Sequence, residues 1–238
     1  MSDDQKKNVD IAKVPEAEVA DVRNLAVKSF LSSLPGLGPA AAEIFNYVFA
    51  PPVVKRQKEW MEAVAARLIE LEKKVDGFKT ENLRDNENFI STVLYATTLA
   101  IRTHEQEKLI ALQNAVANVA ENIPIEHDLE HMFLNFIDEL TAWHLRVLKY
   151  FESPEEWFKQ KGATIPNYSM GGAIAIFYDA FPDLAKSKDF ARQVVEDLAS
   201  KGLSANWESM HVMVSRGSMV GPGITPLGKQ FLNFITSH

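Results

Sequence analysis

The residue type that this 238-residue chain lacks altogether is cysteine. Without thiols it cannot form a disulfide, a thiolate nucleophile, or a cysteine-ligated zinc or iron–sulfur site. We therefore predict a protein of the reducing cytoplasm. The first ten residues are polar and mixed in charge, and no apolar run follows them directly, so no signal peptide is expected.

The chain also lacks an excess of positive charge, because 25 Lys and Arg residues face 32 Asp and Glu residues and the net charge is −7. Bulk electrostatics therefore argue against a protein that coats nucleic acid or acidic membranes. Neither G-x-G-x-x-G nor G-x-S-x-G occurs, so the motifs of dinucleotide binding and of a hydrolase nucleophile are missing. A binding or scaffolding protein is therefore a better prediction than an enzyme.

What the sequence does have is helical periodicity. Apolar residues make up 46% of the chain, which is enough for a sizeable core. They recur at three- and four-residue steps, which predicts helices over about 53–78, 86–102, 104–120 and 126–151. The predicted fold class is mainly α. We expect a disordered tail over residues 1–14, a helical bundle over 15–122 and a second domain over 123–238.

The predicted helix over 53–78 carries apolar residues at alternating steps of four and three. This spacing is typical of the seam of a helix pair or a coiled coil. The seam consists of Val64, Leu68, Leu71 and Val75. We predict that these residues form the interface of a homo-oligomer.

Beyond Pro154 glycine and proline become more frequent, and shorter elements are expected. A helical stripe of Phe190, Val194 and Leu198 ends at K-G-L. A loose alternation over Trp207–Val214 then predicts a strand, S-R-G a tight turn, and T-P-L-G-K-Q-F a closing helix. This order predicts a winged-helix (α+β) module with a short β-hairpin wing.

Three stretches resemble winged-helix domains of the MarR-like kind. W-H-L-R-V-L-K-Y is similar to their first helix, V-V-E-D-L-A-S-K-G-L to their recognition helix, and I-T-P-L-G-K-Q-F to the segment after the wing. The resemblance covers the C-terminal part of the chain. It implies a winged-helix fold and no particular activity.

A module that reads DNA needs a basic face, because phosphate neutralisation supplies most of the affinity. The candidate contacts are Lys188 and Arg192 in the helical stripe and Arg216 at the wing tip. Acidic residues outnumber the basic ones within that helix. We therefore predict that the module contacts protein, and a DNA-binding transcription regulator is the alternative.

The stretch H-D-L-E-H matches H-x-x-E-H, in which two histidines one turn apart hold zinc and a glutamate activates water. The candidate ligands are His127, Glu130 and His131. If Leu129 marks the centre of the apolar stripe, a step of about 100° per residue places both histidines opposite the core. An exposed pair lacks the dry cavity of a zinc enzyme, so we predict no bound metal and no enzymatic activity.

Several other features favour structural roles. Gly223–Gln230 fits G-x-x-x-x-G-K, but Gln stands where a P-loop needs Ser or Thr. His144 lies on the apolar side of its helix and is expected to form a hydrogen bond within the core. The four tryptophans are dispersed along the chain and are interpreted as packing anchors. Met210, Met213 and Met219 either fill a core edge or form an adaptable contact surface.

Residues 30–54 contain one charged residue, Glu43, and the basic cluster K-R-Q-K follows them, as at a membrane surface. Prolines and glycines interrupt the segment, so it is not a simple transmembrane helix. It is either a helical hairpin buried in the bundle or in a subunit interface, or an element that inserts into lipid after a trigger. In the second case the membrane contacts would be Leu37, Ile44, Phe45 and Phe49.

The combination of L-P-G-L-G-P, an apolar helix stopped by prolines, K-R-Q-K-E-W and the seam helix resembles bacterial abortive-infection proteins of the Abi-alpha kind. The resemblance covers the N-terminal half and implies a role in phage defence. We predict a non-enzymatic, self-associating helical protein without a cofactor, whose winged helix contacts a protein partner. The alternatives are a transcription regulator and a membrane-acting effector that uses residues 30–54.

Overall fold

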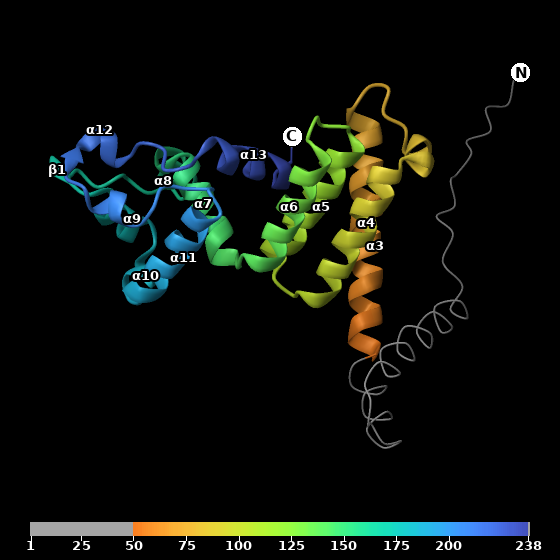
Figure 1. The fold of residues 1–238 in the computed structure, drawn as a ribbon, viewed down its shortest axis with the longest axis horizontal. Coiled ribbons are helices and arrows are strands. Elements are labelled where there is room, and N and C mark those ends of the chain that lie inside the picture. The colour runs from red at the N-terminus through yellow and green to blue at the C-terminus, as the bar shows by residue number, and fades with distance from the viewer. Residues whose placement is uncertain (1–49, 238) are drawn as a thin grey trace, which may run out of the picture. The chain divides into compact units, whose positions relative to one another are not determined.

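The computed structural model describes residues 50–237 (Figure 1). The predictions for the tail over residues 1–14, and for Leu37, Ile44, Phe45 and Phe49, lie outside these described residues. The described part is mainly helical, with a small two-stranded antiparallel sheet. Residues from Trp60 onward belong to one compact unit. Within residues 50–237 no helix combines the length and the apolar character needed to cross a membrane.

The first helices of the described chain are long and follow one another closely. They are α3 (Ala50–Lys74), the 3-10 helix η1 (Thr80–Asp85), α4 (Glu87–Arg102), α5 (Gln106–Ala120) and α6 (His127–Glu139). The helices predicted over 86–102 and 104–120 are confirmed as α4 and α5. Pro51 and Pro52 lie in the first described turn of α3, where proline is tolerated, and the helix that they were expected to stop lies outside the described residues.

The single helix predicted over 126–151 is two helices in the structure. Helix α6 ends at Glu139, and α7 (Ala142–Glu152) begins after Thr141. The N–H of Thr141 donates to Nδ1 of His144 at 3.0 Å, which satisfies a backbone donor at the start of α7. Apolar residues continue through the break, and Leu140 is buried there. Because the apolar periodicity continues through this cap, the sequence predicted one helix where the structure has two.

The elements after α7 are shorter. They are α8 (Pro154–Gln160), β1 (Met170–Gly171), α9 (Ala173–Ala180), α10 (Pro182–Ala185), α11 (Lys188–Ser200), η2 (Glu208–His211), β2 (Val214–Ser215), α12 (Arg216–Met219) and α13 (Pro226–Ile235). The stripe expected on α11 is buried at Val194 and Leu198, whereas Phe190 is exposed.

The predicted β-hairpin wing does not form as expected. Strand β2 pairs with β1, which precedes α9, with Met170 opposite Ser215 and Gly171 opposite Val214. Half of the strand expected over Trp207–Val214 is η2, and the S-R-G stretch expected as a turn contains the start of α12. Trp207 and Met210 are both buried, and their three-residue spacing requires a helical turn rather than a strand.

A second antiparallel bridge closes the loop that contains η2, β2 and α12. It joins Ser204 to Ile224. The N–H of Ala205 donates to the carbonyl of Gly223 at 2.8 Å, and the N–H of Thr225 donates to the carbonyl of Leu203 at 3.1 Å. We call residues 205–223, which lie between these hydrogen bonds, the wing loop.

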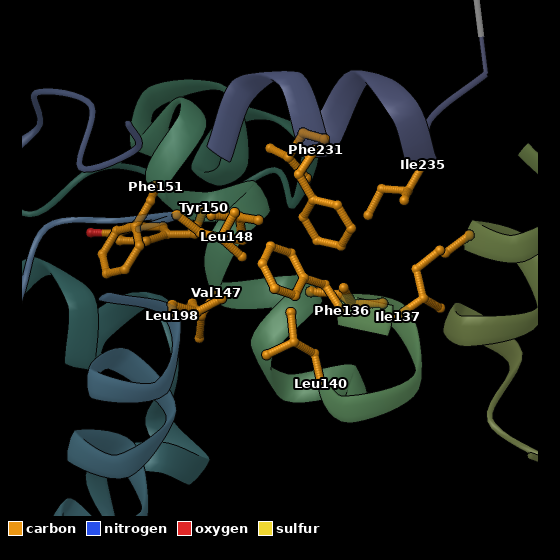
Figure 2. Packing of buried hydrophobic residues seen from close by; sticks show 14 of the residues in the cluster. Phe136, Ile137, Leu140, Val147, Leu148, Tyr150, Phe151, Leu198, Phe231 and Ile235 are labelled. Carbon is orange, nitrogen blue, oxygen red and sulfur yellow. The ribbon is translucent and has the colours of Figure 1, made fainter. Parts of the chain in front are cut away.

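Helix α13 packs against α5 and α7 and so joins the early helices to the later ones (Figure 1). Figure 2 shows Phe136 of α6 and Phe231 of α13 pointing toward one another, with ring centres 5.8 Å apart. Phe133 and Phe234 extend this contact, with ring centres 5.6 Å apart. Two buried asparagines of α5, Asn114 and Asn118, donate to carbonyls of the last turn of α13.

The seam predicted as an oligomer interface is used within the chain. Val64 and Leu71 are buried, and Leu68 packs against the same core. Trp60, one turn before Val64, donates from its Nε1 to the hydroxyl of Thr97 on α4 at 2.9 Å. A side chain that its own chain covers cannot also line an interface with a second copy. The oligomer contacts predicted for Val64 and Leu71 are therefore corrected, because these side chains are turned into the core.

Candidate functional site

The H-x-x-E-H stretch lies on the first turns of α6 and faces two ways. Glu130 is only 2% exposed and is turned toward α4, whereas His127 and His131 are exposed. The Glu130 carboxylate accepts hydrogen bonds from the Thr92 hydroxyl and from Nδ2 of Asn88, the latter at 2.8 Å. The glutamate therefore joins two helices and does not point toward a space between the histidines.

The hydrogen bonds around the two imidazoles are best satisfied by opposite tautomers. Since Asn88 uses its amide nitrogen for Glu130, its oxygen accepts from Nδ1 of His127 at 2.8 Å, and the lone pair of His127 is on Nε2. Asn135 accepts from the Tyr95 hydroxyl, so its amide nitrogen donates to Nδ1 of His131 at 3.2 Å. The second lone pair is therefore already occupied.

These tautomers make the histidine pair a poor chelate, because a metal needs a lone pair from each ring on the same side. His131 also stacks on Tyr95, with ring centres 5.0 Å apart. Among residues 50–237 no group of three or more His, Asp or Glu side chains is placed to hold a metal ion. The arrangement of this stretch suits a polar contact between α4 and α6.

Two of the basic residues predicted as nucleic-acid contacts, Lys188 and Arg192, have partners within the chain. Nη2 of Arg192 lies 3.6 Å from a carboxylate oxygen of Glu208 in η2. Nζ of Lys188 lies 5.9 Å from the centre of the Tyr178 ring. Arg216 is the first residue of α12. The α11 surface therefore offers little unpaired positive charge.

The acidic residues of α11 also have structural roles. Glu196 accepts from the N–H of Trp207 at 3.3 Å and so anchors the start of the wing loop. Asp197 lies 3.3 Å from Nε2 of His144, which is buried as the sequence led us to expect. Burial lowers the pKa of His144, and the hydrogen bond to Asp197 offsets part of this shift.

An apolar surface is exposed where β1 meets β2. Met170 and Met213 are each 68% exposed, Val212 is 57% exposed and Tyr168 is 39% exposed. The β1–β2 register, continued by one pair, places Met213 opposite Gly172, and alternation along the strands then puts Met170 and Met213 on one face. We call the set Tyr168, Met170 and Met213 the wing face.

The opposite side of the two strands is packed. A Cβ atom at Gly171 would lie 3.3 Å from the terminal methyl of Met219, which is buried. Met210 is buried as well, so two methionines of the wing loop fill the core while Met213 is exposed. Met210 and Met219 thus take the core role that the sequence left open, and a contact surface at Met213 stays a prediction. The sequence analysis did not single out Tyr168 or Met170, because a two-residue strand has no periodicity to detect.

Three of the four tryptophans, dispersed in the sequence, come together in space. Trp143, Trp157 and Trp207 each contact Phe177 or Phe181, with ring centres between 4.9 and 6.4 Å apart. Trp207 is buried, and the other two are partly buried and packed against the core. The aromatic cluster is therefore a core rather than a platform for stacking bases.

The G-x-x-x-x-G-K match has a packing explanation. The hydroxyl of Thr225 accepts from the N–H of Gly228 at 2.9 Å and caps the start of α13. A Cβ atom at Gly228 would lie 2.1 Å from the carbonyl oxygen of Leu203, so only glycine fits there. Close contact between α13 and the strand-like segment at Leu203 accounts for this glycine without a phosphate.

A shallow cleft of about 310 Å³ lies between the α5–α6 connection and α13. Its lining includes Ile123, Ile125, Leu129 and Phe234, together with Glu126. The cleft combines apolar walls with a few polar groups but gathers no set of side chains suited to catalysis.

No protein-family model, curated protein or solved structure matches this chain. The resemblances to MarR-like and Abi-alpha proteins therefore stay predictions.

Proposed function

We propose that this chain is a non-enzymatic helical protein whose C-terminal module serves contact with another protein. The observation that carries the proposal is the wing face, a group of exposed apolar side chains, together with the basic residues of α11, which already have partners. Apolar surface rimmed by polar residues is typical of protein interaction sites. Nucleic-acid surfaces instead gather unpaired positive charge.

We further propose that the module is a variant winged helix. The order of α7, β1, α9 and α11, then the bridged pair at Ser204 and Ile224, then α13 supports this assignment. In this interpretation α11 takes the place of the recognition helix and the wing loop takes the place of the wing. The wing loop differs from a simple hairpin because it holds η2, β2 and α12.

A gel-shift titration with random-sequence duplex DNA at low salt tests the choice of partner class. We expect no tight, salt-sensitive binding, because Arg192 and Lys188 are engaged within the chain. Tight binding that Lys188→Ala and Arg192→Ala abolish would instead support the transcription regulator. Lys74→Ala, on the exposed end of α3, is the matched control for loss of one positive charge.

We propose that the chain self-associates through the face of α3 that the core leaves exposed. Met61 and Ile69 lie on α3 and are exposed, in contrast to Val64 and Leu71. Met61→Glu combined with Ile69→Glu should lower the mass of the full chain in sedimentation velocity. Leu94→Glu, an exposed apolar position on α4, is the control and should leave the mass unchanged. Equal masses for all three proteins would contradict the proposal.

The role in phage defence, the cytoplasmic location and the membrane-acting alternative remain proposals that rest on the sequence. Cell fractionation of the full chain beside a version that starts at Pro51 separates the last two. A full chain found with membranes and a shortened chain found in the soluble fraction would support the effector. Soluble recovery of both would favour the scaffold.

A further inference from the structure

We infer that the wing face binds a short amphipathic protein segment with basic side chains. In this arrangement apolar side chains of the segment pack on Met170 and Met213, and a Lys or Arg of the segment pairs with Asp179. The inference rests on the proposed protein-contact function and adds the chemical class of the partner.

The apolar part of the inference follows from the size of the wing face. Its three side chains make a patch of at most about a few hundred Å². Stable interfaces between folded proteins bury about 800 Å² per partner, so the wing face is too small to hold a second folded copy by itself. A short segment with a few apolar anchors fits the patch. Methionine side chains adapt to such anchors because they are flexible and polarisable.

The charged part of the inference follows from Asp179 on α9. Its Oδ2 accepts a hydrogen bond from the Tyr168 hydroxyl at 2.9 Å, which places an exposed carboxylate at the edge of the wing face. Within the described residues Asp179 takes part in no ion pair. A carboxylate beside apolar side chains complements a cation that flanks apolar anchors.

Close backbone contacts hold the segment that carries the wing face, which lowers the entropic cost of binding. A Cβ atom at Gly172 would lie 2.6 Å from the carbonyl oxygen of Met210, so the residue after β1 lies directly against η2. Met219 supports the neighbouring Gly171 from the buried side. A surface whose backbone is fixed before binding loses less conformational freedom when a partner arrives.

The test uses two fluorescent helical peptides of equal length, with leucine at the same helical spacing and either lysine or glutamate at every polar position. Fluorescence anisotropy with the full chain measures their affinities. We expect the leucine–lysine peptide to bind and the leucine–glutamate peptide not to bind. Met170→Glu combined with Met213→Glu should weaken binding at least about tenfold, and Asp179→Asn about threefold or more.

Matched controls separate the wing face from the general negative charge of the chain. Leu94→Glu replaces an apolar side chain that is 65% exposed on α4. Asp85→Asn removes an exposed carboxylate in η1. Both controls should leave the affinity for the leucine–lysine peptide unchanged. Because all the substituted side chains are exposed, thermal melts of the variants should match that of the parent chain.

Each outcome decides the inference. Equal binding of the two peptides through Met170 and Met213, or equal effects of Asp179→Asn and Asp85→Asn, would overturn the basic partner and leave protein contact standing. Absence of peptide binding, or binding that the methionine substitutions do not change, would overturn the inference as a whole. Binding of the chain to phosphatidylglycerol vesicles that depends on the same methionines would overturn both the inference and the proposed function.

Discussion

The region from α4 to α6 and the region from α7 to α13 pack differently: buried alanines are frequent in the first, and aromatic rings meet in the second. Ala96, Ala100, Ala111 and Ala115 are all buried in the first region. In the second region Tyr150 and its neighbours form a chain of rings whose centres lie 5.4 to 6.2 Å apart. Small side chains let long helices approach closely, and large rings fill the space between short helices that cross at varied angles.

The two regions also differ in how they bury polar groups. The first buries a carboxylate, Glu130, between two neutral donors. The second buries an imidazole, His144, between a backbone N–H and Asp197. Each arrangement satisfies the buried group, as a packed interior requires. In the first region a hydrogen-bond network between helices satisfies the buried polar group. In the second region a helix cap satisfies it.

The largest expected effect comes from the close contact that the second region needs. Gly228→Ala should lower the free energy of unfolding by about 3 kcal/mol or more, because its Cβ would overlap the Leu203 carbonyl. Urea denaturation measures the change. Gly217→Ala is the control, since a Cβ there meets nothing within 4 Å. Similar midpoints for both variants would show that α13 does not approach Leu203 so closely.

The next effect concerns the junction between the regions. Nδ2 of Asn118 donates to the carbonyls of Asn233, Phe234 and Thr236 at 2.8 to 3.0 Å. Asn118→Leu should lower the free energy of unfolding by about 2 kcal/mol, because buried carbonyls lose their donor. The control is Asn82→Leu at an exposed position. An unchanged denaturation midpoint for Asn118→Leu would count against α13 as the link.

A smaller effect probes the polar network of the first region. Thr92→Val should cost about 1 kcal/mol, because Glu130 loses one of its two donors while the shape of the side chain is kept. Thr98→Val removes an exposed hydroxyl that bonds only its own helix and serves as the control. Chemical denaturation should separate the two variants. Equal stability would mean that Glu130 gains nothing from the Thr92 hydroxyl.

The smallest effect concerns pH. Burial lowers the pKa of His144 below its ordinary value of 6.5, so the unfolded chain binds a proton more readily than the folded chain. Its contribution to stability is therefore full above about pH 6.5 and is lost as the pH falls below that value. His144→Gln keeps a capping side chain but cannot titrate, so it should flatten the dependence of Tm on pH between 7 and 5. An unaltered slope would show that other groups set it.

The sequence predicted the fold class and the long helices because their apolar residues repeat over several turns. The break between α4 and α5 was expected at Thr103, whose hydroxyl accepts from the N–H of Glu105 at 3.2 Å. The break at Thr141 was missed because the cap is a histidine and the apolar pattern continues. Strand β1 was missed because two residues carry no pattern.

The candidate site was less predictable than the fold. The mixed charge of α11 was visible in the sequence, but the pairing of Arg192 with Glu208 depends on how the wing loop packs. The exposure of Met170 and Met213, in contrast to Met210 and Met219, depends on register and on a turn of η2. Such differences arise from tertiary packing and not from local pattern.

The hydrogen bond from Asn118 to Phe234 joins residues 116 positions apart. Closing so long a loop costs entropy before the contacts made there return any stabilisation, and non-local contacts of this kind slow folding. Docking of α13 is therefore expected late on the folding path. Until that step the rings of Phe133 and Phe136 lack their partners on α13. The time that α13 needs to dock therefore sets how long this apolar surface is exposed to aggregation with other chains.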